Sequence, residues 1–505
     1  MVHGKELGLK GSRRIAFVTL VVAAGLYGLW QCVPGFRPKH VRDIMNGLIF
    51  VKGSAIAVYF GMLALLIPAA RLLRERGVSR TIIGSFFILL SALLTLDIAF
   101  GVVAGSKHAA LWGMRLFYIA VVVWGCRDLA NLRSLFVGVR DRVRVIWSDL
   151  PPWWRLFLGL LVFFLIRQDM HLYLYRTEIK GDEVTWWQTG AKMMMNHGVL
   201  ATMRDHTYGH YVPAIPWLIA LPNRLLGAHV ERWLWGFPLF AMCTYGWLLL
   251  ELTTTGWGFL AGWTGIFLIF LGSRDLMHMF CAFFYGEAIT SGLVGVLAAE
   301  LYLRWQEARG RAGLRKTMAR FFRPASGAGL GLLASFCILA KPPVGVLLPL
   351  FMPLAVVMAL WARAWLGAAL FFALAHAAPF GWKNVLASLG HAPEYNVSLA
   401  DVLKSGINLD LIWPMLAGLV MYPGAPQFGL TLGLAFALCV AALSGEKKLF
   451  AWMVTVATLY WGFVFGLYAT LWQRGDFTSA ARYIAHAAVA MPLLLPLAFP
   501  RKKHL

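Results

Sequence analysis

Two adjacent carboxylates, Asp182 and Glu183, follow a long apolar run and open a polar segment in an otherwise hydrophobic chain. Ionised carboxylates in such a position can take a proton from a hydroxyl group or bind a divalent cation. An acid pair can also stabilise the first turn of a helix, because negative charge is favourable there. Both interpretations stay open on the residues alone. The segment that follows is rich in aromatic and histidine side chains: Trp186, Trp187, His197, His206, Tyr208, His210, Tyr211 and Trp217.

Three further polar groups lie near the ends of apolar runs. They are His278 with Glu287, Lys341 before two prolines, and Arg482 with Tyr483. A lysine can hold a phosphate as a point charge, and an arginine can bind one through two hydrogen bonds. An ionisable side chain at membrane depth costs about 3 kcal/mol or more, so each group needs a partner or a function. The structural alternative is that the side chain extends to the membrane surface.

The composition excludes a soluble protein. The 505 residues are 60% hydrophobic and only 14% charged, and a soluble chain of this length could not bury so much apolar surface. The net charge of +23 comes from short basic clusters between apolar runs. This pattern is typical of the inner loops of membrane proteins, so the expected partners are membrane lipids and not nucleic acid. The six cysteines form no CxxC pair and predict no metal site or disulfide framework.

The apolar runs predict an all-α polytopic membrane protein, because a membrane-spanning helix needs roughly 20 apolar residues. About 14 spans are expected on this criterion. They lie near 14–31, 47–70, 81–104, 109–126, 152–170, 232–251, 257–272, 284–303, 327–341, 343–361, 365–380, 426–443, 449–470 and 483–499. Four ionisable residues in or beside these runs are expected to be structural: Lys52, Asp97, Arg167 and Asp169.

Basic segments set the expected orientation. Residues 304–323 contain seven Arg or Lys and one Glu, so they are expected on the inner side. This requires that the apolar run 211–227 does not cross the membrane. Prolines and Arg224 interrupt that run, which predicts an interfacial helix within an external loop spanning 171–231. Both termini are then cytoplasmic. The acid pair and the three further polar groups described after it are all expected on the external face.

The order of these motifs along residues 155–500 resembles that of the GT-C membrane glycosyltransferases, which use polyprenyl-phosphate sugars. This group includes protein O-mannosyltransferases, lipid A aminoarabinose transferases and mycobacterial arabinosyltransferases. The resemblance rests on Gly181-Asp182-Glu183, residues 215–221 (IPWLIAL) with 224–227 (RLLG), Arg232, Glu287, Lys341-Pro342-Pro343 and Arg482-Tyr483. Where the aminoarabinose transferases have an acidic-Lys-Pro-Pro run, residues 209–213 read Gly-His-Tyr-Val-Pro.

The resemblance implies transfer of a single sugar to a glycan, lipid or protein acceptor on the periplasmic face of a bacterial inner membrane. It implies that Asp182 is the catalytic base, and that Glu183 and Glu287 orient substrate or bind a divalent cation, with His278 as a further metal ligand. The residues implied to contact substrate or lipid phosphate are Lys341, Arg482, Tyr483, Arg204, His210, Tyr211 and Trp187. The apolar runs and basic clusters predict a four-helix membrane module (1–126) and a cytoplasmic basic connector (127–155), and the resemblance implies a GT-C-like catalytic domain (156–505).

Two other functions stay open. A transporter or flippase of lipid-linked sugars would use the same charges along a pathway, but it would favour ionisable residues near mid-span and internal repeats. An O-antigen ligase or polymerase would move whole glycans from a diphosphate carrier. The collection of polar groups on one face favours an enzyme, and the acid pair after a span favours transfer of a single sugar.

Overall fold

The computed structural model describes twelve main stretches of the chain and a few single residues between them. The stretches are 64–76, 78–104, 106–127, 129–175, 189–205, 213–226, 237–271, 287–309, 314–341, 364–391, 426–472 and 477–499. Most residues of these stretches lie in helices, and none of them lies in a strand. The prediction of an all-α protein is therefore confirmed for the part of the chain that the structure describes.

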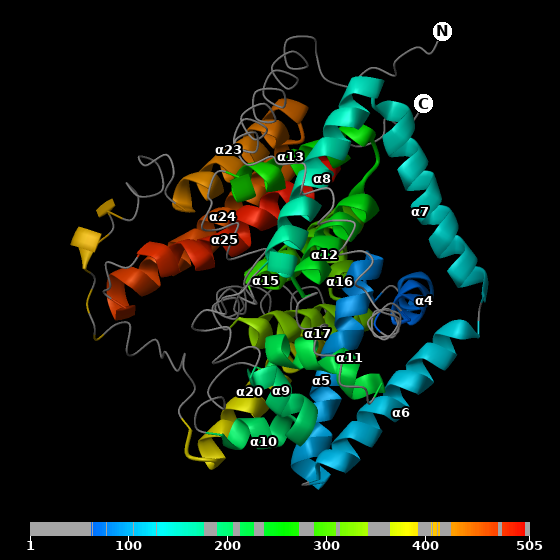
Figure 1. The fold of residues 1–505 in the computed structure, drawn as a ribbon, viewed down its shortest axis with the longest axis vertical. Helices are drawn as coiled ribbons and strands as arrows, with labels where there is room; N and C mark the ends of the chain where they lie inside the picture. Colours follow the sequence, from blue (N-terminus) through cyan, green and yellow to red (C-terminus); the bar gives the residue numbers. More distant parts are fainter. Residues whose placement is uncertain are drawn as a thin grey trace.

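Figure 1 shows the described helices, coloured in chain order. Their bounds are α4 (Leu66–Arg76), α5 (Ile82–Ala104), α6 (Lys107–Cys126), α7 (Leu129–Asp149), α8 (Pro152–Tyr175), α9 (Thr189–His197), α10 (Val199–Arg204), α11 (Ala214–Leu226), α12 (Phe237–Leu252), α13 (Gly256–Leu271), α15 (Glu287–Arg309), α16 (Leu314–Phe321), α17 (Pro324–Ala340), α20 (Trp365–Ser388), α23 (Pro426–Ser444), α24 (Lys447–Leu467) and α25 (Phe477–Leu494).

Every expected span between 81 and 341 coincides with a described helix, and so do the expected spans at 365–380, 426–443, 449–470 and 483–499. Within the described residues, four helices are long and apolar enough to cross a membrane, namely α5, α6, α20 and α24. The other apolar helices are shorter. The expected spans 14–31 and 343–361, and most of 47–70, lie outside the described residues, so the total of about 14 stays a prediction.

Contacts along α5, α17 and α20 show that these helices run in the same direction. The rings of Phe87 on α5 and Phe336 on α17 are 6.0 Å apart. A side chain at Gly331 of α17 would approach the Phe371 carbonyl oxygen of α20 within 2.6 Å, so glycine permits the close packing of these two helices. The C-terminal ends of all three helices therefore lie together. We call this end of the bundle the Lys341 end, and the opposite one the Glu300 end.

Two carboxylates hold the first turn of α5 at the Glu300 end. Glu251 of α12 accepts hydrogen bonds from the backbone N–H groups of Ile82 and Ile83, at 2.7 and 2.9 Å. Glu300 of α15 accepts from the backbone N–H groups of Arg80 and Thr81, both at 2.8 Å. The first N–H groups of a helix have no partner within the helix, and its positive end favours anions. These bonds therefore fix α5 to α12 and α15.

Two helices in basic segments were not expected, α7 in the connector 127–155 and α16 in the segment 304–323. The α7 helix runs along one edge of the molecule from the end of α6 to the start of α8 (Figure 1). Its last residue, Asp149, accepts a hydrogen bond from the Gly256 N–H at the start of α13, at 3.2 Å. The α16 helix joins the end of α15 to the start of α17. Both helices therefore lie at the Glu300 end.

The helix expected at 211–227 is confirmed as α11, and its position at the membrane interface stays a prediction. All the side chains from Ala214 to Arg224 are buried. The Arg224 guanidinium forms a buried ion pair with Asp97 of α5, and the Trp217 Nε1–H donates to the same carboxylate at 2.8 Å. Protein neighbours therefore cover this helix, although its prolines and Arg224 had indicated only that it does not cross the membrane.

One large hydrophobic core extends through the described residues from Met62 to Phe499. It includes α5 together with α12, α15, α17 and α25. The described part of 1–126 thus shares a core with the remainder of the chain, while the division into an N-terminal module and a catalytic domain stays a prediction.

We expect Glu300→Ala to lower the free energy of unfolding by about 1–3 kcal/mol, because buried N–H donors at the start of α5 lose their acceptor. Thermal unfolding in one detergent, followed by tryptophan fluorescence, measures the change. Glu307→Ala is the matched control, since this acid lies on the same helix, is 55% exposed and pairs only across the surface with Arg80. Equal melting temperatures for the two variants would contradict the anchoring role of Glu300.

Candidate active site

A buried ion pair joins the ends of two helices at the Lys341 end. Glu287 is the first residue of α15, and Lys341 is the residue that follows α17. The Lys341 Nζ lies 3.1 Å from Glu287 Oε1, and the exposed fractions of the two side chains are 6% and 0%. Because both charges are almost completely removed from water, each depends on close partners for its stability.

The local sequence explains why these two residues occupy the helix ends. A glutamate in the first turn interacts favourably with the positive end of the helix, and a lysine after the last turn interacts favourably with the negative end. Lys341 has extended backbone angles, with φ −155° and ψ 113°. The residue before a proline is restricted to such angles, and Pro342 follows directly. The helix therefore ends at the position that presents the lysine.

The start of α25 completes this group. The Lys341 Nζ lies 5.4 Å from the centre of the Tyr483 ring, within the range of a cation–π interaction. Tyr483 is itself buried. Three residues that are far apart in the sequence, Glu287, Lys341 and Tyr483, thus meet where α15, α17 and α25 begin or end. We call these three residues the Lys341 group.

Two further buried residues support the Lys341 group, and the sequence analysis missed them. The ring of His486, one turn after Tyr483 on α25, makes an edge contact with the Tyr483 ring at 6.1 Å between centres. The Tyr460 hydroxyl of α24 lies 2.6 Å from His486 Nδ1. A histidine inside an apolar run was the available signal, because ionisable residues within spans need partners. Tyr460 carries no comparable signal, since tyrosine is common in apolar helices.

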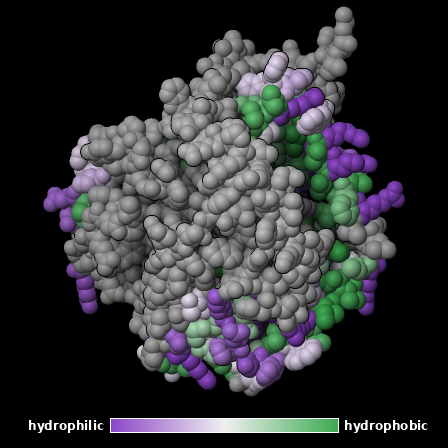
Figure 2. All heavy atoms as spheres, viewed as in Figure 1, coloured by the Kyte–Doolittle hydropathy of each residue, from purple (hydrophilic) through white to green (hydrophobic). Residues whose placement is uncertain are grey.

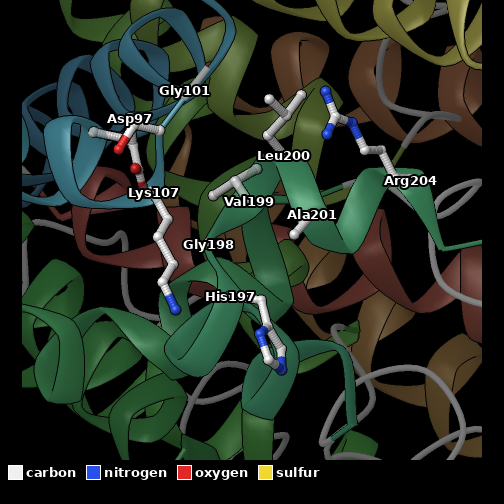
Figure 3. A pocket seen from close by; sticks show the side chains of 11 residues that line it. Asp97, Gly101, Lys107, His197, Gly198, Val199, Leu200, Ala201 and Arg204 are labelled. Carbon is white, nitrogen blue, oxygen red and sulfur yellow. The ribbon is translucent and has the colours of Figure 1, made fainter. Parts of the chain in front are cut away.

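A separate cavity of about 260 Å³ lies at the same end of the molecule, between the end of α5, the start of α6 and the pair α9–α10. Its lining includes Asp97, Lys107, His197 and Arg204, and Figure 3 shows them on different walls. The Lys107 Nζ donates to the Asn196 carbonyl oxygen at 3.2 Å. Asp97 already holds Arg224 in the buried pair described above. The cations that face this cavity are therefore Lys107 and Arg204, with His197 beside them.

The expected site residues divide into three sets. Glu287, Lys341 and Tyr483 lie together in the Lys341 group, and Arg204 lines the separate cavity at the same end. Arg482 belongs to α25, but its side chain lies outside the described residues, as do Asp182, Glu183, Trp187, His210, Tyr211 and His278.

Among the residues that the structure describes, no three His, Cys, Asp or Glu side chains lie close enough together to hold a metal ion. The proposed ligands Glu183 and His278 are not among the described residues, so the divalent cation stays a prediction.

Comparisons with protein families, curated proteins and solved structures found no match to this chain.

We expect Glu287→Gln and Lys341→Met each to destabilise the protein by about 3–5 kcal/mol, because each leaves the partner's charge buried. The double variant Glu287→Gln/Lys341→Met removes both charges and should recover most of this loss. Melting temperatures of the three variants and the wild type, measured in one detergent, test the expectation. A double variant as unstable as the sum of the single variants would show that the two residues are not energetically coupled.

Proposed function

We propose that the chain is a membrane glycosyltransferase that moves a single sugar from a polyprenyl-phosphate donor to an acceptor hydroxyl. The observation that carries the proposal is the Lys341 group. The sequence resemblance names Glu287, Lys341 and Tyr483 as functional residues from three separate motifs, and the Lys341 ammonium group contacts both of the others. This meeting of residues from three separate motifs is the feature that supports a shared function.

Charge distribution supports an external position for the Lys341 end. The basic helices α7 and α16 both lie at the Glu300 end, and they carry Arg133, Arg140, Arg144, Arg315 and Lys316. Basic segments are retained on the cytoplasmic side of membranes. The Lys341 end then faces the outside, where a lipid-linked donor presents its sugar.

The proposed reaction is a displacement at the anomeric carbon of the donor sugar. The acceptor oxygen forms a bond to this carbon while the bond from the carbon to the phosphate oxygen breaks. Asp182 takes the proton of the acceptor hydroxyl, and polyprenyl phosphate leaves with the bonding electron pair. Negative charge grows on the phosphate during this step, so a fixed cation beside it stabilises the transition state.

Lys341 is suited to this role because Glu287 fixes its position. The Lys341 Nζ donates a hydrogen bond to Glu287 Oε1 at 3.1 Å, and this contact holds the ammonium group where α15 begins and α17 ends. The ring of Tyr483 borders the ammonium group in a cation–π contact at 5.4 Å. The cavity lined by Lys107 and Arg204 supplies a second cationic region at the same end for a polar part of the donor or the acceptor.

Release of free polyprenyl phosphate from a panel of polyprenyl-phosphate sugars, by purified protein in lipid nanodiscs, tests the function. We expect wild type to release the lipid with at least one donor, and Asp182→Asn to lose at least about a hundredfold in rate, since the amide cannot accept the proton. The control Glu307→Gln also replaces a carboxylate by an amide, but at an exposed position near the Glu300 end. It should retain full activity.

Two outcomes would contradict the proposal. Asp182→Asn protein that is folded and as active as wild type would exclude this residue as the base. No release with any donor, together with movement of labelled lipid-linked sugar across a bilayer, would assign the chain to the transporters.

A further inference from the structure

The helix α7 buries some of its side chains against the protein and exposes others. Leu135 and Ile146 are buried against the bundle. Three large apolar side chains on the same helix are nevertheless exposed, Phe136 by 65%, Val143 by 49% and Trp147 by 62%. They recur at intervals of seven and four residues, so they form one stripe along the helix. We call this stripe the α7 apolar stripe.

A stripe of arginines lies beside the apolar stripe. Arg133, Arg140 and Arg144 are all exposed, and each precedes a member of the apolar stripe by three residues, which places it on the neighbouring part of the helix surface. Asp141 lies within 3.3 Å of the Arg140 guanidinium. Going around α7, the surface thus changes from a buried face to an exposed apolar stripe and then to an exposed cationic stripe.

The helices on either side of α7 also expose apolar side chains. Trp112, Leu116, Ile119 and Val123 are exposed on α6, a helix long and apolar enough to cross a membrane, and Trp153 and Leu156 are exposed on α8. Figure 2 shows green hydrophobic surface with projecting purple side chains along the edge where α6 and α7 lie in Figure 1. Trp147 is also covered on one face by the Arg155 guanidinium, 5.1 Å from the ring centre. Tryptophan and arginine side chains are typical of the boundary between lipid chains and headgroups.

We propose that α7 is an interfacial helix that binds anionic phospholipids at the Glu300 end of the protein. The apolar stripe enters the boundary between acyl chains and headgroups, and the arginine stripe contacts the lipid phosphates. An apolar face next to a basic face is the arrangement of helices that lie in the plane of an anionic membrane surface. The α7 helix is joined directly to α6, whose exposed apolar side chains indicate lipid on the same side of the bundle. This inference does not depend on the proposed enzymatic activity.

The first test determines whether the α7 apolar stripe is in contact with lipid or with water. In full-length protein without its six native cysteines, a fluorescent label is attached at Phe136→Cys or, as the matched control on the other exposed side of α7, at Ser148→Cys. The protein is reconstituted in vesicles that contain phosphatidylglycerol and phosphatidylcholine. We expect brominated acyl chains to quench the label at position 136, and aqueous iodide to quench the label at position 148.

Two results would overturn the insertion of the apolar stripe. Quenching of both labels by iodide would place the whole helix in water. Protection of the label at position 136 from both quenchers would show that a second copy or another protein covers it.

The second test measures the role of the arginine stripe. The relative affinity of the protein surface for brominated phosphatidylglycerol over brominated phosphatidylcholine is determined from quenching of the label at position 136. We expect a several-fold preference in wild type that falls to about one in Arg133→Gln/Arg140→Gln/Arg144→Gln, since arginines near a membrane surface attract anionic headgroups.

The control Arg315→Gln/Lys316→Gln/Arg320→Gln removes the same number of charges from the exposed side of α16 at the same end, and it should leave the preference unchanged. An equal loss in both triple variants would assign the preference to total charge instead of α7. An unchanged preference in the α7 variant would also overturn the proposal.

Discussion

The contact between Glu287 and Lys341 is the interaction on which the proposed active site depends. Each charge is stabilised by the other, because an isolated buried ion costs several kcal/mol. The pair therefore requires the start of α15 and the end of α17 to lie together. Tyr483 brings the start of α25 to the same place. One electrostatic constraint thus sets the relative positions of three helix ends that contribute residues to the site.

The same physics operates elsewhere in the molecule. Helices in lipid gain little from hydrophobic contact with one another, so polar contacts and close packing of small residues decide how they associate. Asp97 and Arg224 fasten α11 to α5, and Glu300 fastens the first turn of α5 to α15. The candidate site and its neighbouring cavity lie at the Lys341 end. The opposite end holds the basic helices α7 and α16.

The positions of many helices were predictable from the sequence, but the contacts between helices were not. Apolar runs located most of the described helices, because a run of roughly 20 apolar residues predicts a helix long enough to cross a bilayer. The helices α7 and α16 were missed because charged residues interrupt their apolar pattern. The burial of α11 depends on neighbours that its own sequence does not identify. Likewise Glu287 and Lys341 stood out as charges in an apolar chain, but their pairing comes from tertiary structure alone.

The contact between Tyr460 and His486 was also not predicted. Each residue lies in an apolar run, and the run predicts a helix without indicating what its polar side chains contact. A single histidine in such a run indicates that a partner exists without identifying it. Twenty-six positions separate the two residues, so only the packing of α24 on α25 could reveal their contact.

The most direct test of the account is to crosslink a polyprenyl-phosphate analogue, with a photoreactive group next to the phosphate, to the reconstituted protein and to identify the labelled peptides. The account predicts labelling in peptides that contain Lys341 or the first turns of α15 and α25, and competition by unlabelled polyprenyl phosphate. Competable labelling confined to the Glu300 end, in α7 or α16, would contradict the placement of the lipid phosphate beside Lys341.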